Sequence, residues 1–284
     1  MLGSIWAYYE LGWGGFWFWD PVENVSLMPW FCLTALVHCI LVLEKRLLLS
    51  SWTVILSIAT FMLSMSGTFL VRSGILNSVH TFANDPERGI FILIFLFTLI
   101  FFSLAIFFIF HKENNQKIVE IYWLSKETSI LFNNWFLMYF LSVVLIGTVY
   151  PIFLEVLSDE KISVGPPFYH KLIIPFLIPF LIFMSIGPNL NWIKSKVKKI
   201  NIKIILSFLF SLLISLLILR KIGYVGLINT ILILAAFYLF FITIKDFFLK
   251  KFKNYSQNFS HFGFSLLILS ILFNSILSSE KTIN

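Results

Sequence analysis

The sequence predicts an all-α fold, a polytopic membrane helical bundle with about eight transmembrane helices and both termini outside. The first observation is composition, because 59% of the 284 residues are apolar and only 12% are charged, whereas a soluble domain has roughly 25% charged residues. The second is that the charged residues leave uncharged stretches close to the roughly 20 residues that a membrane helix needs. The third is an uneven distribution of Lys and Arg among the loops.

Each uncharged stretch is predicted to be one membrane helix. In chain order, the expected spans are 27–43, 52–70, 91–110, 128–150, 172–190, 203–219, 226–244 and 261–278. The sixth is the shortest, since only 16 residues separate Lys203 from Arg220, and Arg220 and Lys221 can snorkel outward to complete it. Pro175 and Pro179 should kink or loosen the fifth span, because proline removes a backbone donor.

The charged loops set the expected orientation. Loops that follow odd-numbered spans hold 14 of the 21 Lys and Arg residues, and the positive-inside rule places such loops in the cytoplasm or matrix. The segment 5–30, the loop 71–90 and both termini then face outward. The net charge of +7 is therefore a topology signal, and nucleic-acid binding is not expected. Residues 1–284 are expected to form a single membrane domain with no soluble domain.

The two cysteines predict no disulfide chemistry. Cys32 and Cys39 lie seven residues apart in the first span, or about 10 Å along a helix, which is too far for a disulfide. The chain has no C-x-x-C motif of the kind that exchanges thiols and disulfides. No cleavable signal peptide is expected, because the first residues lack a basic region followed by an apolar core.

The most unusual segment is WGGFWFWDPVENVSLMPW, residues 13–30, which stands where a membrane helix begins. Its tryptophans are Trp13, Trp17, Trp19 and Trp30. Tryptophans at such a place often anchor a helix at the lipid headgroups. The density of rings beside Gly14 and Gly15 instead favours a platform for a broad, planar, apolar ligand. Asp20 is expected either to cap the next helix or to orient a ligand histidine.

Two histidines lie at matched depth within predicted spans. His38 is six residues before Glu44, and His261 is eight residues after Lys253. At 1.5 Å per residue these spacings correspond to about 9 and 12 Å from the inner boundary of the membrane. The two imidazoles are interpreted either as axial ligands on opposite faces of one haem iron or as side chains that hydrogen-bond helix backbones. Spacing alone favours neither interpretation.

Several stretches resemble the CcmF family of haem-handling proteins of cytochrome c maturation. The segment WAYYELGWGGFWFWDPVENVSLMPW is similar to the tryptophan-rich WWD signature of that family. Similar stretches follow in TALVHCILVLEKR, GTFLVRSGILNSVHTFANDPERGIFIL and SHFGFSLLILSILF. The resemblance extends from about residue 5 to about residue 278, and Phe16 stands where the family usually has Trp.

The resemblance implies a function in haem handling and ligation. The chain would hold haem on its outer WWD face for covalent attachment to apocytochrome c, as a component of a haem lyase complex in which catalysis is positional. The strip, including Asp20, would bind this transient haem substrate, and His80 matches one of two external histidines that ligate its iron. His38 and His261 match two membrane histidines that bind a b-type haem.

The resemblance also implies partners and a location. The family's other external histidine would lie upstream of Met1, so a separate polypeptide is expected to carry it, and a split gene or a truncated sequence would explain this equally well. Other partners would be apocytochrome c, the remaining maturation subunits and a haem chaperone. A bias toward Phe, Ile, Asn and Lys is typical of an AT-rich genome, and together with the resemblance it fits an organelle-encoded protein. It favours the mitochondrial inner membrane, with a bacterial inner membrane as the alternative.

The roles of several other polar residues are interpreted as binding or as structural. Arg72 and Arg88 bracket the loop that holds His80, and they either bind haem propionates or serve as ordinary interface arginines. His111 ends the third span and is interpreted as structural, because a histidine at a helix C-terminus interacts well with the helix dipole. His170 begins the fifth span, where it anchors the helix at the interface or reaches the haem edge.

Two other functions use parts of the same pattern. A haem carrier or exporter of the CcmC type would need the tryptophan strip but not a second, buried haem. A membrane subunit of a respiratory chain would explain two histidines in the spans but not the strip. One buried b haem together with one labile external haem would favour the haem lyase component.

Overall fold

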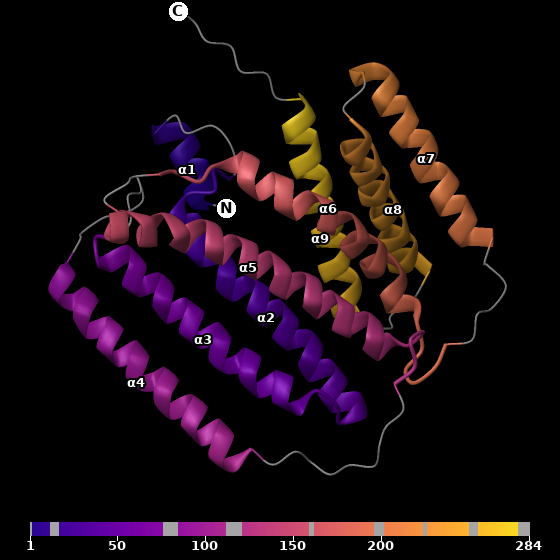
Figure 1. The fold of residues 1–284 in the computed structure, drawn as a ribbon. Coiled ribbons are helices and arrows are strands. Elements are labelled where there is room, and N and C mark those ends of the chain that lie inside the picture. The colour runs from indigo at the N-terminus through magenta and orange to yellow at the C-terminus, as the bar shows by residue number, and fades with distance from the viewer. Residues whose placement is uncertain are drawn as a thin grey trace, which may run out of the picture. The chain divides into compact units, whose positions relative to one another are not determined.

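The computed structural model describes residues 2–11, 17–75, 85–111, 121–158, 162–195, 202–223, 226–249 and 255–277. Within these residues every regular element is helical, so the all-α prediction is confirmed (Figure 1). The elements are α1 (Leu2–Leu11), α2 (Pro21–Arg46), α3 (Ser50–Arg72), α4 (Pro86–Phe110), α5 (Lys126–Ser158), α6 (Pro166–Ile186), the 3-10 turn η1 (Gly187–Asn189), α7 (Ile202–Ile222), α8 (Leu227–Leu249) and α9 (Tyr255–Leu277).

Eight helices of the described chain, α2 to α9, are long and apolar enough to cross a membrane. Each coincides with one predicted span, so the prediction of a polytopic bundle is confirmed. The short sixth span corresponds to Ile205–Ile222 of α7, a stretch of 18 residues. Arg220 and Lys221 lie in the last turn of that helix, where snorkelling can complete the span. The α6 helix runs through Pro175 and Pro179.

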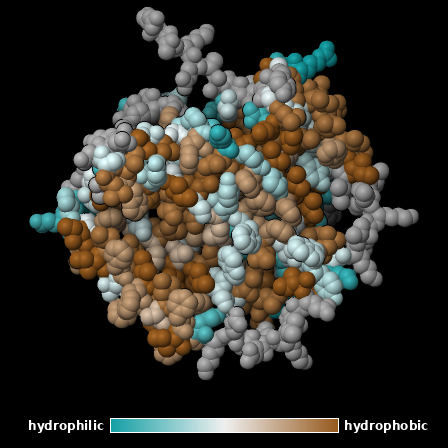
Figure 2. Space-filling model, in the orientation of Figure 1, coloured by the Kyte–Doolittle hydropathy of each residue, from teal (hydrophilic) through white to brown (hydrophobic). Residues whose placement is uncertain are grey.

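The α4 helix illustrates the surface that such a fold presents to lipid. Large apolar side chains are exposed along its length, including Phe91, Phe101 and Phe108 at 71%, 68% and 77%. Of its residues, Gly89 and Leu96 are buried. A helix that is apolar on all sides suits hydrocarbon and not water. Figure 2 shows hydrophobic residues over much of the visible described surface, as expected of a multi-pass membrane protein.

The chain divides into two compact units, and each is described by itself. The first comprises Met1–Val119 and Asn134–Ile173, and the second comprises Glu120–Asn133 and Ile174–Asn284. Helices α1 to α4 belong to the first unit and α7 to α9 to the second, while α5 and α6 each contribute to both.

The core of the first unit is one face of α2. Its buried residues recur every three or four positions and include Val25, Met28, Cys32, Ala35, Cys39 and Val42. This spacing places them on one side of a helix. Cys39 is fully buried, and its Sγ accepts a hydrogen bond from Nδ2 of Asn134 in α5 at 3.1 Å. Both cysteines are buried and free in this structure.

The core of the second unit is α8, which packs between α7 and α9. Phe241 of α8 meets Phe210 of α7 with ring centroids 4.7 Å apart, and Phe237 of α8 meets Phe273 of α9 at 6.0 Å. The buried apolar residues of α8 are Leu232, Ile233, Ala235, Ala236, Phe237, Leu239 and Ile242. The broad buried face identifies α8 as the central helix of this unit.

Backbone hydrogen bonds join the start of α5 to the segment after η1 in the same unit. The Lys126 N–H donates to the Asn191 carbonyl at 3.0 Å, and the Ser195 N–H donates to the Leu124 carbonyl at 2.7 Å. The buried carboxylate of Glu127 accepts the Ile193 N–H, at 3.0 and 3.1 Å to its two oxygens. A buried carboxylate needs such donors, because an unpaired buried charge is costly.

We expect Gly147→Ala to destabilise the first unit. A Cβ at Gly147 would lie 2.7 Å from the Tyr169 hydroxyl oxygen and 2.9 Å from Cε1 of Phe168. Overpacking of this kind costs about 1–3 kcal/mol. The matched control is Gly263→Ala in α9, where an added Cβ meets nothing within 4 Å and alanine should stabilise the helix by about 0.5–1 kcal/mol. Thermal unfolding in detergent measures both, and equal midpoints for the two variants would contradict the prediction.

We expect both ends of the chain to face outward. Eight spans return the chain to the side on which it started, and the positive-inside rule gives that side. In intact mitoplasts, protease should remove a tag fused before Met1 or after Asn284, and it should spare a tag inserted within 191–203 until the membrane is permeabilised. Protection of the C-terminal tag would contradict this topology.

Candidate functional site

The start of α2 is fixed by a capping box. Oδ2 of Asp20 accepts the Val22 N–H at 3.0 Å, and Oε2 of Glu23 accepts the Asp20 N–H at 3.2 Å and the Phe18 N–H at 2.9 Å. Such reciprocal bonds satisfy backbone donors that have no partner within the helix. The capping interpretation of Asp20 is confirmed. The tryptophan strip is therefore attached directly to a rigid helix end.

Trp19 is held in an unusual conformation at this end. Its φ of 59° lies in the left-handed region, which costs a residue with a Cβ about 1–2 kcal/mol. Nδ2 of Asn24 donates to the Trp19 carbonyl at 3.1 Å and to the Tyr169 hydroxyl at 3.0 Å. The Trp19 ring stacks on the Tyr169 ring with centroids 4.2 Å apart and planes 6° apart. These contacts offset the backbone strain and fix the indole in place.

The aromatic cluster consists of Trp17, Trp19, Tyr169 and His170. Trp17 meets the edge of Trp19 at 6.2 Å, and His170 meets it at 6.2 Å with its plane inclined by 74°. Tyr169 is buried, whereas His170 is exposed. The indole Nε1 of Trp17 is buried and has no hydrogen-bond partner among the described residues. The cluster thus combines flat apolar faces, an unused donor and an exposed imidazole.

Tyr169 and Asn24 are site residues that sequence reasoning missed. They lie 145 positions apart and meet because α6 begins beside the start of α2. The fully buried Tyr169 packs over Gly147 of α5, which leaves room for its ring. The available signal was a polar Asn24 on an otherwise apolar helix face, since a buried amide requires partners.

The two arginines lie at this same end of the first unit. Gly67, near the end of α3, packs against Val25, near the start of α2. The Asp85 N–H donates to the Arg72 carbonyl at 2.9 Å, which ties the end of α3 to the start of α4. Nε of Arg88 pairs with Oδ2 of Asp85 at 3.0 Å, and the Arg88 side chain is 71% exposed. An exposed pair of this kind is weak, so the guanidinium can exchange it for another carboxylate.

One ring nitrogen of His38 makes a hydrogen bond within its own helix. Its Nδ1 lies 2.7 Å from the Thr34 carbonyl oxygen, one turn earlier in α2. Because a carbonyl only accepts, Nδ1 carries a proton, and in a neutral ring the lone pair would then be on Nε2. Ligand histidines in metal sites typically donate their other N–H in this manner. His38 therefore fits an iron ligand, and the backbone bond and the ligand interpretations are compatible.

The other histidines are placed as follows. His261 belongs to the second unit, where it lines a small pocket between α6, α8 and α9. Nε2 of His111 lies 2.8 Å from Oγ of Ser51, and its ring stacks on Phe107 with centroids 4.6 Å apart, which supports its structural interpretation. Trp13 and His80 lie outside the described residues. The structure thus brings together Trp17, Trp19 and Asp20, with Arg72 and Arg88 at the same end.

Sequence identity to known proteins identifies the family of this chain. Over 192 residues it is 50% identical to the cytochrome c-type biogenesis protein CcmF of Pseudomonas aeruginosa, an overlap of 68% of this chain and 29% of that protein. It is 44% identical over 200 residues to CcmF of Escherichia coli K12, covering 70% of this chain and 31% of that protein. The chain belongs to the CcmF family.

Other comparisons agree with CcmF. Residues 1–76 match the family model described as Cytochrome C assembly protein. The solved structure of "Cytochrome c Heme Lyase CcmF" superposes with a TM-score of 0.71 at 24% identity, covering 96% of this chain and 42% of that one, and so shares the fold. The chain spans about three tenths of the length of the curated CcmF relatives that it matches.

Proposed function

We propose that this chain binds haem and presents it for covalent attachment to apocytochrome c during cytochrome c maturation. The observation that carries the proposal is the clamped Trp19, held with a left-handed backbone between Tyr169 and the exposed His170. Flat apolar walls with a few polar atoms are typical of sites for planar cofactors. Membership of the CcmF family supports the same substrate, because its relatives are named for cytochrome c biogenesis.

Each predicted site residue has a role in this proposal. Trp13, Trp17 and Trp19 contact the face of the haem substrate, and His80 ligates its iron. A separate polypeptide supplies the second external ligand, and a haem chaperone delivers the substrate. Arg72 and Arg88 bind the two propionates, for which the planar guanidinium is well suited. Arg72 and Arg88 lie at the same end of the first unit as the aromatic cluster, and this placement supports the role.

In the attachment step the protein positions the reactants and takes little part in the bond changes. A cysteine thiol of apocytochrome c adds across a vinyl group of the haem, so that a C–S bond forms and the thiol hydrogen moves to the other vinyl carbon. No electrons are gained or lost overall. The chain would hold the porphyrin flat and leave its vinyl edge open to the incoming thiol. Positioning alone can account for a large part of such a rate enhancement.

A buried b haem would be the resident cofactor. His38 and His261 are proposed as its ligands, and the hydrogen bond of His38 Nδ1 to the Thr34 carbonyl supports this assignment, because it leaves Nε2 to face the iron. The two histidines belong to different units, so the proposal that they share one iron rests on the resemblance to CcmF. When bound, this haem would supply an electron that keeps the iron of the substrate ferrous.

The proposed location is the mitochondrial inner membrane. The bias toward Phe, Ile, Asn and Lys supports an organelle-encoded chain. The relatives named above are bacterial, and a bacterial inner membrane is the alternative. Fractionation of source cells distinguishes the two, because co-sedimentation with mitochondria supports the first and its absence rejects it.

The proposed function is tested with the chain purified together with its maturation partners. We expect one tightly bound b haem and one labile haem, and crosslinking of the labile haem site to an apocytochrome c peptide. Trp19→Ala should remove the labile haem and spare the b haem. The matched control is Trp135→Ala in α5, whose ring is 64% exposed and lies outside the cluster. A complex without labile haem, or equal loss in both variants, would reject the proposed function.

A further inference from the structure

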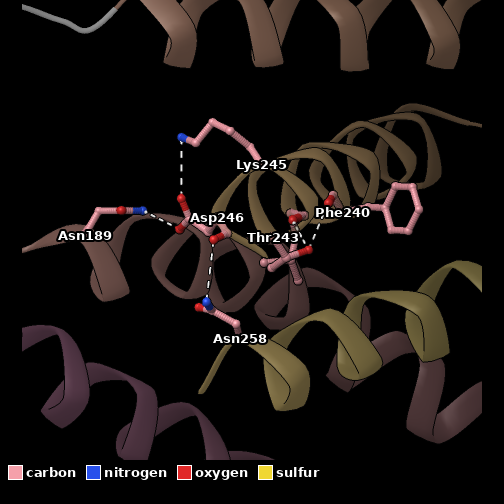
Figure 3. Close-up of polar contacts among 7 residues, drawn as sticks. Asn189, Phe240, Thr243, Lys245, Asp246 and Asn258 are labelled. Atoms are coloured by element: carbon pink, nitrogen blue, oxygen red, sulfur yellow. Dashed lines mark hydrogen bonds and ion pairs between the residues drawn. The ribbon is translucent and has the colours of Figure 1, made fainter. Parts of the chain in front are cut away.

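Asp246 is a buried carboxylate that the proposed function does not use. It lies in α8, within the candidate span Leu227–Phe248, and its side chain is 10% exposed. Nδ2 of Asn189 donates to its Oδ2 at 3.3 Å, and Nζ of Lys245 lies 3.8 Å from its Oδ1 (Figure 3). Asp246 lies near the end of that span, and a carboxylate buried there is costly unless it is paired and hydrogen-bonded.

Two polar contacts join α8 to α9, one before and one after His261 along α9. Asn258, His261 and Ser265 lie at positions i, i+3 and i+7, which share one face of a helix. Nδ2 of Asn258 donates to the Asp246 main-chain oxygen at 3.5 Å, and Oγ of Ser265 lies 3.2 Å from Oγ1 of Thr243. Both contacts are within the second unit. They fix the rotation of α9 about its axis one turn on either side of His261.

The same residues line one small pocket. Its lining includes Ser185, Thr243, Asp246, Asn258 and His261, and its free space is about 10 Å³. A space of this size holds at most one water molecule, and only where polar partners surround it. Asp246 and His261 thus both line one common, water-sized space.

We propose that Asp246 is the positioning residue for His261. The Asp246 carboxylate accepts the ring N–H of His261 that does not face the iron, directly or through one water in the pocket. This inference rests on the proposed function, in which His261 ligates a buried b haem. Ligand histidines usually donate their second N–H to a carboxylate, a carbonyl or water. In α2, the Thr34 carbonyl already fills this role for His38.

Two consequences distinguish positioning from a structural role. Loss of the carboxylate should weaken haem retention about tenfold, the lower end of the range for such partners. Loss of its negative charge alone should raise the midpoint potential of the haem, because a nearby negative charge stabilises ferric over ferrous iron. A residue that serves only packing would change thermal stability and leave the potential unaltered.

The test uses the full-length chain purified with its haem. Asp246→Ala should lose haem about tenfold faster than the unchanged chain, Asp246→Asn should keep the fold and shift the potential upward, and Asp246→Glu should restore both values in part. The matched control is Glu127→Gln, which alters another buried carboxylate of the same unit outside the pocket. It should lower stability and leave the potential unchanged.

The outcomes separate this inference from the function on which it rests. An Asp246→Asn chain with the same potential and the same haem retention as the unchanged chain overturns the positioning role alone. A potential shift in Glu127→Gln equal to that in Asp246→Asn overturns it as well. An unchanged chain that purifies without b haem rejects the buried haem of the proposed function and this inference together.

Discussion

Replacement of either His38 or His261 with alanine is expected to abolish the low-spin bis-histidine spectrum of the purified chain. Each histidine is proposed to donate one nitrogen to the same b-type iron, so that loss of one ligand leaves the iron five-coordinate or releases the haem. The Nδ1 of His38 is already committed to the Thr34 carbonyl at 2.7 Å, which leaves Nε2 for the metal. Reduced-minus-oxidised difference spectra measure the effect directly, and added imidazole should restore part of the signal in either variant.

Two further histidines provide controls for this experiment. His111→Ala removes an imidazole that contacts Ser51 and Phe107, so it should change stability and leave the spectrum intact. His80→Ala should also leave it intact, because His80 is predicted to lie outside the membrane. If the His38 and His261 variants keep the native spectrum, or if His80→Ala alone removes it, the assignment of the buried ligands is wrong.

Asn24→Ala is expected to cost the labile external haem while the b haem stays bound. Nδ2 of Asn24 holds both the Trp19 carbonyl and the Tyr169 hydroxyl. Its loss removes one hydrogen bond from the buried Tyr169 hydroxyl, which keeps its bond with Thr148, at a cost of about 0.5–1.5 kcal/mol. It also frees Trp19 to leave its strained backbone conformation. A misplaced ring should weaken external haem binding by about tenfold or more, equivalent to roughly 1.4 kcal/mol. Haem titration of the purified complex measures this affinity.

Asn134→Ala is the matched control for that variant. Asn134 is also a fully buried asparagine of the first unit, it donates to Cys39, and its Oδ1, like that of Asn24, has no partner among the described residues. Its replacement should destabilise the unit to a similar degree and leave external haem affinity unchanged. Equal affinity losses in the two variants would show that general destabilisation, and not release of Trp19, explains the effect.

The eight spans could be predicted because hydrocarbon selects for composition along the chain, and charged residues mark where each span stops. Helix ends could not be placed as well. The first and last spans were predicted to start at 27 and 261, whereas α2 starts at Pro21 and α9 at Tyr255. Hydropathy detects the apolar part of a helix, while its first turn is set by caps such as Asp20.

The candidate site was predictable only where its parts are close in sequence. The strip containing Trp17 and Trp19 was identified from ring density, and Asp20 from its position before an apolar run. The contact of Asn24 with Tyr169 joins residues 145 positions apart, and no local pattern encodes such a contact. The two interpretations of His38 could not be separated by spacing, because one imidazole can satisfy both with its two nitrogens.

Glycine would adopt the backbone conformation at position 19 with the least strain, because φ is 59° there and glycine has no steric penalty in that region. At Trp19 the cost of this conformation is set against the ring contacts with Tyr169 and His170. Trp19→Gly should therefore relieve the backbone strain and remove both ring contacts, so that backbone strain and ring placement can be measured separately at one position.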